Sequence, residues 1–138
     1  MKQLIFVGSS DDELREFPRD VQRAMGYALY VAQQSDKHPD AEPLRGYKGS
    51  GVLEVIEDDD NNTYRTVYTV RLSEAVYVLH AFQKKSTTGI KTPKRHMDLV
   101  DKRLKMATDI DAELKAARMN ALKKTPKNTP KRRTVDER

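Results

Sequence analysis

The stretch that decides the fold is Thr63-Tyr64-Arg65-Thr66-Val67-Tyr68-Thr69-Val70-Arg71-Leu72-Ser73-Glu74-Ala75-Val76-Tyr77-Val78-Leu79-His80-Ala81-Phe82-Gln83-Lys84-Lys85. Tyr, Val, Thr, Leu and Phe fill both halves, and these side chains suit a pleated, half-buried surface. Between the halves, Ser73 and Glu74 are the expected two-residue turn, although the turn has no Gly or Asn to mark it strongly. The stretch therefore predicts a hairpin of two antiparallel strands.

The pairing of these strands groups several polar side chains on one face. With a two-residue loop, Arg65 lies opposite Phe82. Side chains alternate along a strand, so His80 and Lys84 share the face of Arg65, while Lys85 points the other way. A shift of register by one residue would separate this group. The hairpin thus predicts a face with a guanidinium, an imidazole and an amine beside an aromatic ring.

Before the hairpin, we expect a strand, two helices and a second strand. Residues 3–7 predict the first strand, and Ser10-Asp11-Asp12-Glu13 matches a helix capping box. Pro18 either ends that helix or opens the next one at its first position. Residues 35–51 predict a long loop by composition, and residues 52–56 the second strand. The second helix has apolar residues at helical spacing, namely Val21, Met25, Ala28, Leu29 and Ala32.

After the hairpin, Thr92-Pro93 predicts the start of a long helix that runs to about Lys123. The remainder, 124–138, has a Thr-Pro-Lys repeat and almost nothing apolar, which predicts a disordered basic tail. The expected architecture is α+β, in the order β-α-α-β-β-β-α, with one mainly antiparallel four-stranded sheet and helices packed on it. The expected division is a domain at 1–123 and a tail at 124–138. The apolar face of the long helix consists of Met97, Val100, Leu104, Ala107, Ile110, Leu114 and Ala117.

Charge is distributed unevenly along the 138 residues. Residues 1–83 hold 9 Lys and Arg against 14 Asp and Glu, whereas residues 84–138 hold 17 against 7. A basic half on an otherwise acidic protein suggests a polyanionic partner, although many basic tails serve only solubility.

Composition also excludes several classes of function. The chain has no Cys and 3 His, so neither a disulfide framework nor a structural zinc site is expected. The acidic turn at 57–62 fails the calcium-loop spacing, and we therefore expect no metal and no cofactor. No apolar run approaches the length of a membrane span, so a cytoplasmic protein without membrane contact is the expectation.

Five segments carry a resemblance to a known family, namely Leu4-Ile5-Phe6-Val7-Gly8-Ser9-Ser10, Leu14-Arg15-Glu16-Phe17-Pro18, Tyr64-Arg65-Thr66-Val67-Tyr68, Ala75-Val76-Tyr77-Val78-Leu79-His80-Ala81-Phe82-Gln83-Lys84-Lys85 and Lys91-Thr92-Pro93-Lys94. Together they resemble the phage-derived HigB-like toxins of the RelE/ParE superfamily. The resemblance covers roughly residues 3–107, and it implies a small β-α-α-β-β-β-α fold. It also implies the toxin of a type II toxin–antitoxin pair, held in a hetero-oligomer by a helix-turn-helix, HigA-like antitoxin. RelE-like and HigB-like members cut mRNA on the ribosome without a metal.

The resemblance assigns roles to a few positions only. Arg65 matches the basic residue that contacts the scissile phosphate, and Lys84 or Lys85 matches a second cation at the end of the last strand. Members differ in their acid and base, so the resemblance assigns no role to His80. The helix and tail beyond about Ala107 exceed the usual toxin length.

Metal-free RNA cleavage needs a base for the 2′-hydroxyl, cations for the phosphorane and an acid for the leaving oxygen. Arg65 suits phosphate binding through its planar fork, and Lys84 suits charge stabilisation. His80 suits acid or base work, while a buried, hydrogen-bonded histidine is an equally good interpretation. Arg65, His80 and Lys84 are the predicted catalytic residues. The predicted RNA-binding residues are Lys48, Lys85, Lys91, Lys94 and Arg95.

Two other functions fit the same sequence. One is a ParE-like inhibitor of DNA gyrase that cleaves nothing, and the other is a non-toxic phage accessory protein that binds nucleic acid. The resemblance favours the ribosome-dependent mRNA endonuclease.

Overall fold

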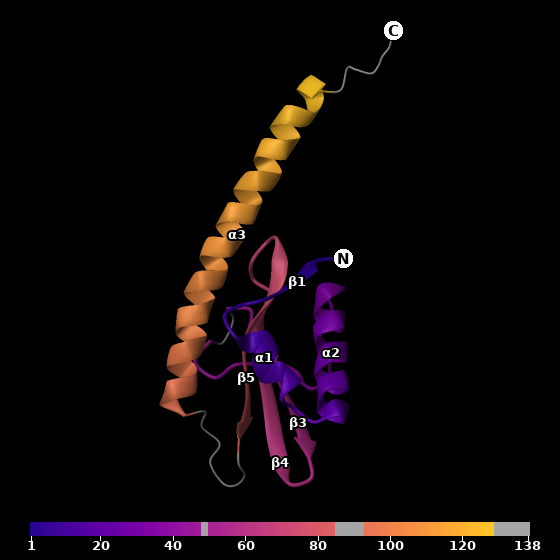
Figure 1. Ribbon diagram of the computed structural model, residues 1–138, viewed down its shortest axis with the longest axis vertical. Helices are drawn as coiled ribbons and strands as arrows, with labels where there is room; N and C mark the ends of the chain where they lie inside the picture. The colour runs from indigo at the N-terminus through magenta and orange to yellow at the C-terminus, as the bar shows by residue number, and fades with distance from the viewer. Residues whose placement is uncertain (48–49, 85–92, 129–138) are drawn as a thin grey trace.

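The computed structural model describes residues 1–47, 50–84 and 93–128, with side chains up to residue 123. Helices and strands follow one another in a single mixed unit (Figure 1). In chain order they are β1 (Gln3–Phe6), α1 (Ser10–Arg15), α2 (Arg19–Gln33), β2 (Ala41–Pro43), β3 (Val52–Asp59), β4 (Asn62–Thr69), β5 (Ala75–Lys84) and α3 (Lys94–Asn128).

The sheet has five strands in the order β1-β5-β4-β3-β2, with β1 parallel to β5 and the other pairs antiparallel. The α+β class and the long C-terminal helix are confirmed, but the prediction of four strands is wrong. The additional strand, β2, lies inside the segment predicted as a loop, where Ala41–Pro43 pairs with Leu53–Val55. Such a short edge strand tolerates a proline and has no alternating pattern long enough to show in the sequence.

The β4–β5 hairpin has the predicted register around the polar face, with Arg65 opposite Phe82. The predicted two-residue turn is wrong, because β4 ends at Thr69 and β5 begins at Ala75. A bulge after Val67 leaves Leu79 without a partner in β4 and shifts the pairing by one residue toward the loop. The bulge compensates for the different loop, so the residues beyond it still pair as expected.

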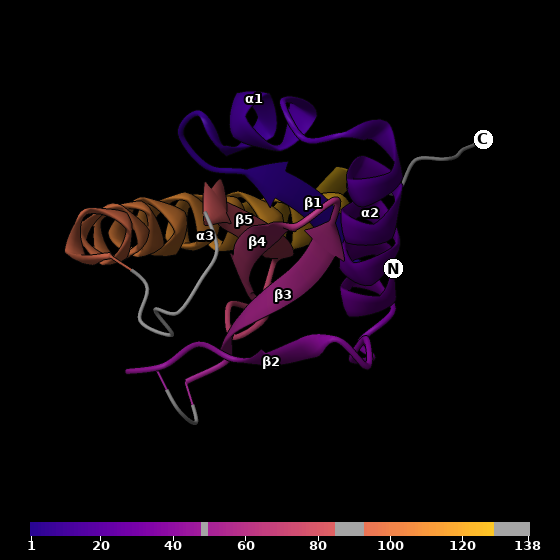
Figure 2. The ribbon, with the colours of Figure 1, turned by 90° about the horizontal axis from the view of Figure 1, so that it is seen from below.

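Helices α2 and α3 cover opposite faces of the sheet (Figure 2). The predicted apolar stripe of α2 is confirmed, since all five of its residues are buried. They pack in a core that includes Tyr68, which therefore faces away from Arg65. On the other face, Val100, Leu104 and Ala107 of α3 pack with Phe82 of β5. The polar face of the hairpin is thus the face that α3 covers.

Helix α1 covers the part of β5 that β1 leaves open. β1 pairs with β5 only as far as Val78, so the outer edge of β5 has no strand beyond that residue. The predicted capping box is wrong: the N-cap is Ser9, which makes no side-chain capping bond, and the Ser10 hydroxyl donates to the Val78 carbonyl at 3.1 Å. Glu13 instead turns toward β5, because the Ala81 amide at the open strand edge has no strand partner and donates to Oε1 of Glu13.

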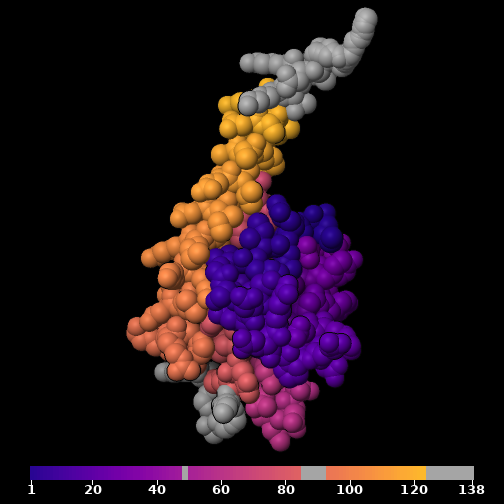
Figure 3. Space-filling model, in the orientation of Figure 1, coloured from indigo at the N-terminus to yellow at the C-terminus, as the bar shows by residue number. Residues whose placement is uncertain are grey.

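Helix α3 continues well past the sheet, and its last turns stand clear of the body (Figures 1 and 3). It ends at Asn128, five residues beyond the expected end at Lys123. The rest of the predicted tail, 129–138, lies outside the described residues. Within the described part of the chain, no helix has both the length and the apolar character needed to cross a bilayer.

Candidate active site

The two nitrogens of the His80 ring both have partners. His80 is 4 % exposed, and its Nδ1 lies 3.0 Å from Oε1 of Glu13 in α1. Its Nε2 lies 2.7 Å from Nδ1 of His96, in the first turn of α3. Phe82 stacks on both imidazoles, with ring centroids 5.1 Å from His80 and 4.1 Å from His96. The three residues Glu13, His80 and His96 therefore form a hydrogen-bonded chain, which we call the histidine chain.

Glu13 is held as a carboxylate at the inner end of this chain. Arg103 donates to both of its oxygens, at 2.9 and 3.0 Å, and the Ala81 amide donates to Oε1 at 3.2 Å. Burial by itself would raise the pKa of Glu13, but the hydrogen bonds from Arg103 and Ala81 and the nearby positive charge lower it to about 2. Glu13 is therefore ionised at neutral pH and can only accept hydrogen bonds.

This carboxylate determines where the protons of the histidines lie. Nη1 of Arg103 also lies 3.3 Å from Nδ1 of His80, but its two hydrogens go to Glu13 and to the Leu79 carbonyl. Because Glu13 only accepts, we assign the proton of His80 to Nδ1, so that Nε2 accepts. His96 then donates from Nδ1 to His80, which leaves the Nε2 lone pair of His96 without a proton. The arrangement is a carboxylate and an imidazole that orient a second imidazole.

Both histidines are neutral at physiological pH. Burial lowers the pKa of His80, against the opposing charge of Glu13. Burial, together with the neighbouring His80 and Arg95, lowers the pKa of His96 to about 4. At neutral pH His96 is thus already in the unprotonated form that a general base needs, although its lowered pKa makes it a weaker base than an ordinary imidazole; the role of general acid, which needs the protonated form, suits it less.

A cavity of about 360 Å³ opens at the outer end of the histidine chain. Its lining includes two cationic side chains, Arg95 and Lys102, both exposed. An anionic ligand in this cavity would lie beside the imidazole of His96. The residues that line it are His80, Arg95, His96, Asp98, Leu99 and Lys102.

Arg65 lies on the predicted face but is held in an ion pair. Its Nη1 is 3.2 Å from both carboxylate oxygens of Glu54, and the two side chains are only 12 and 7 % exposed. Burial raises the pKa of Glu54, and the charge of Arg65 opposes that rise. Phe82 occupies the position opposite Arg65 and stacks on His80. The sheet thus brings Arg65 near the histidine chain, while Glu54 balances its charge.

The other predicted site residues are spread around this face. Lys84 is half-buried opposite Thr63, and burial followed by the charge of Arg65 lowers its pKa. Lys94 and Arg95 are exposed in the first turn of α3, and Lys94 pairs with Asp98 at 2.9 Å. Lys48, Lys85 and Lys91 lie outside the described residues.

The sequence analysis missed three members of the site. Glu13 was assigned to the capping box, and His96 and Arg103 received no role. Arg103 is only 6 % exposed although it is charged. His96 and Arg103 fall on the apolar stripe of α3, four residues before and three residues after Val100. Polar residues at core positions are the signal that could have identified them.

One group among the described residues has the ligand types that metals bind. His38, Asp40 and Glu57 place one ligand atom each within 4.8 Å of one another. However, Nδ1 of His38 already accepts a hydrogen bond from the Asp40 amide at 3.0 Å. Burial and the adjacent Asp40 raise the pKa of Glu57 to about 7, so Glu57 holds a proton below that pH. Nδ1 of His38 therefore has a partner without an ion, whereas Oε2 of Glu57 is buried without a hydrogen-bond partner. The absence of a metal stays a prediction.

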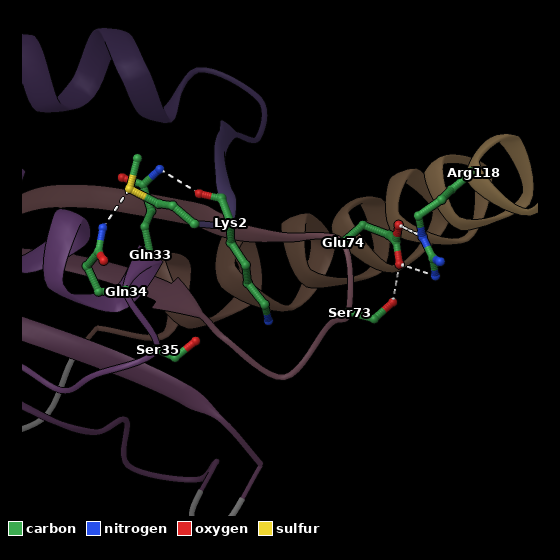
Figure 4. Close-up of a pocket in the computed structure, with 8 residues that line it drawn as sticks. Lys2, Gln33, Gln34, Ser35, Ser73, Glu74 and Arg118 are labelled. Atoms are coloured by element: carbon green, nitrogen blue, oxygen red, sulfur yellow. Dashed lines mark hydrogen bonds and ion pairs between the residues drawn. The ribbon is translucent and has the colours of Figure 1, made fainter. Parts of the chain in front are cut away.

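A second cavity, of about 530 Å³, lies where α3 passes the start of the chain and the end of α2 (Figure 4). Arg118 on its rim binds Glu74 through two bonds of 2.7 and 3.1 Å. Lys2 crosses the cavity and donates to the Leu72 carbonyl at 3.2 Å. Its lining consists of amides, hydroxyls, charged groups and the thioether of Met1, without a histidine, which makes it a poorer candidate for acid–base chemistry.

The family model described as "Phage derived protein Gp49-like (DUF891)" matches residues 12–105. The chain belongs to this Gp49-like family. The family is associated with RelE/HigB-like toxins, so a toxin-like function fits the chain at this coarse level. The matched residues of this Gp49-like chain contain Glu13, His80, His96 and Arg103. No curated protein matches the chain.

Proposed function

We propose that this Gp49-like protein is the toxin of a type II toxin–antitoxin pair and cleaves mRNA on the ribosome without a metal. The observation that carries the proposal is the histidine chain, which ends in a neutral imidazole beside a cavity with two cations on its lining. General-base catalysis and charge stabilisation are the two functions that RNA cleavage through the 2′-hydroxyl needs first.

In the proposed reaction, Nε2 of His96 takes the proton of a ribose 2′-hydroxyl. The 2′-oxygen attacks the adjacent phosphorus, and the bond from phosphorus to the 5′-oxygen breaks. His80 and Glu13 stabilise the imidazolium that forms, because the ionised carboxylate lies at the far end of the same chain. Arg95 and Lys102 balance the charge on the phosphorane, and the ammonium of Lys102 protonates the leaving oxygen. The products are a 2′,3′-cyclic phosphate and a 5′-hydroxyl.

Arg65 takes a supporting role in this mechanism. Its guanidinium is paired with Glu54, so a phosphate would have to compete with that carboxylate for it. We assign Arg65 and Lys84 to the RNA backbone that flanks the cut, and Lys94 to a backbone contact at the start of α3. The histidines, rather than Arg65, carry the chemistry.

The test is cleavage of mRNA on purified, programmed ribosomes. His96→Asn should lower the rate of cutting by about 10²-fold or more, because a positioned general base contributes about that much. Arg65→Ala should lower it less. His38→Asn, a change of the same kind at a histidine on a distant loop, serves as the control and should cut at the wild-type rate. A cleavage rate in His96→Asn equal to that of the wild type would refute the proposal.

The partner belongs to the same proposal. A helix-turn-helix, HigA-like antitoxin should neutralise the toxin in a hetero-oligomer, and co-expression of the neighbouring gene with growth as the readout tests this. Toxicity that survives His96→Asn, together with defects of DNA supercoiling, would instead favour a ParE-like gyrase inhibitor.

The accessory nucleic-acid-binding function has one observation in its favour, which is the basic helix that stands clear of the body (Figure 3). A harmless protein that shifts DNA or RNA in a gel would favour it over the toxin.

A further inference from the structure

The buried face of α3 contains two charged residues in an otherwise apolar stripe. Arg103 is 6 % exposed and Asp111 is 7 % exposed, on the same face as the fully buried Val100 and Ala107. Apolar contacts have no preferred direction, so this stripe alone would let the helix slide along the sheet at little cost. A buried charge tolerates no such movement, because it needs its hydrogen-bond partners at a fixed distance.

Asp111 attaches the middle of α3 to the start of β5. Its carboxylate accepts hydrogen bonds from the Glu74 amide at 2.8 Å and the Ser73 amide at 3.2 Å. It also accepts from the Tyr77 hydroxyl at 2.8 Å and the Ser73 hydroxyl at 3.4 Å. The donors belong to Ser73 and Glu74 at the end of the hairpin loop and to Tyr77 near the start of β5. One carboxylate therefore holds the loop against the helix.

Arg103 attaches α3 to β5 at a second level. Besides binding Glu13, it donates to the Leu79 carbonyl at 3.0 Å. Arg103 and Asp111 are separated by about 12 Å along the helix, at about 1.5 Å for each residue. Their partners follow in the opposite order along β5, so the helix and the strand run antiparallel (Figure 1). His96 lies about 10 Å farther along the same helix, where it meets His80.

We propose that Asp111 is a remote positioning residue for the histidine chain: with Arg103 it sets the register of α3 on β5, and that register places His96 against His80. The catalytic consequence rests on the proposed function, whereas the geometric consequence does not. A helix that moves by one residue travels about 1.5 Å, which is enough to break the bond between the two imidazoles. A displacement of about 1 Å at a reacting group costs up to about 10²-fold in rate.

The test compares Asp111→Asn with Asp109→Asn in the full-length protein. Both variants lose one negative charge from α3, but Asp109 is exposed, which makes it the matched control. An asparagine offers one acceptor oxygen, so its amide group would face the backbone donors of the loop. The first readout is the titration of His96 by NMR. Its midpoint should stay near pH 4 in the wild type and the control, and rise by about one unit or more in Asp111→Asn, toward the ordinary histidine value.

The second readout is cleavage on programmed ribosomes. In Asp111→Asn, kcat/KM should fall by about 10- to 100-fold, because His96, Arg95 and Lys102 all lie on α3 and are displaced together. A folded Asp111→Asn protein with the wild-type His96 titration would overturn the proposal. If Asp111→Asn does not fold, Tyr77→Phe removes one of the four bonds, and it should move the titration in the same direction by less. An unchanged titration in Tyr77→Phe overturns the proposal equally. A shifted titration in a protein that never cuts RNA supports the positioning role and removes the proposed function.

Discussion

Glu13 should contribute measurably to stability, although it lies on a six-residue helix near the surface. The change Glu13→Gln keeps the shape of the side chain and removes its charge. Folding lowers the pKa of Glu13 from 4.5 to about 2, which corresponds to an upper limit of about 3 kcal/mol at 1.36 kcal/mol for each unit. The side chain is 24 % exposed, so solvent screening reduces the expected loss to about 2 kcal/mol. A loss of that size lowers Tm by roughly 4–8 °C in a chain of this length.

The assay is urea unfolding of the wild type and Glu13→Gln at several pH values. Because the folded pKa is depressed, the contribution of Glu13 is fully present above about pH 4.5 and is lost as the pH falls through about 2. The difference between the two proteins should therefore be about 2 kcal/mol at pH 7 and shrink steadily below pH 4.5. Glu16→Gln, an exposed glutamate three residues further on, should cost less than about 0.5 kcal/mol. A difference at pH 7 no larger than that control would refute the reasoning.

Three further outcomes follow from the same structure. Gly8 has φ +60°, and a Cβ there would lie 2.9 Å from Nε of Arg103, so Gly8→Ala should lower the free energy of unfolding in urea by about 1–3 kcal/mol. Gly26 lies inside α2 with open space around it, so Gly26→Ala should raise that free energy by up to about 1 kcal/mol, and a loss there would contradict the argument. Folding lowers the pKa of His96 from 6.5 to about 4, so the unfolded chain binds more protons than the folded protein between these pH values. The free energy of unfolding should therefore fall more steeply with decreasing pH in the wild type than in His96→Asn. Parallel curves for the two proteins would argue against a desolvated imidazole. Arg118→Ala removes an ion pair whose arginine is half-exposed, so the Tm of the variant should stay close to that of the wild type, and a clear drop in Tm would mean that the pair holds α3 in place.

Much of the fold could be predicted from local patterns in the sequence. The alternation through the hairpin predicted β4 and β5 and the pairing of Arg65 with Phe82, and the helical stripes predicted α2 and α3. These patterns repeat within a few residues, so each segment carries its own signal. The strand that the sequence missed, β2, has only three residues and ends in Pro43, so it is too short to carry such a pattern.

The candidate site could be predicted only in part. Counting along the hairpin placed His80 on the right face, but its partners come from α1 and from the start of α3, 67 and 16 residues away along the chain. Glu13 fits a capping box by its neighbours, and the structure uses it to fill the open edge of β5 instead. The sequence by itself determined most of the strands and helices and the apolar side of α2. Only the tertiary structure decided which polar groups meet, because hydrogen bonds between distant segments depend on the relative positions of α1, β5 and α3, and no local period records those positions.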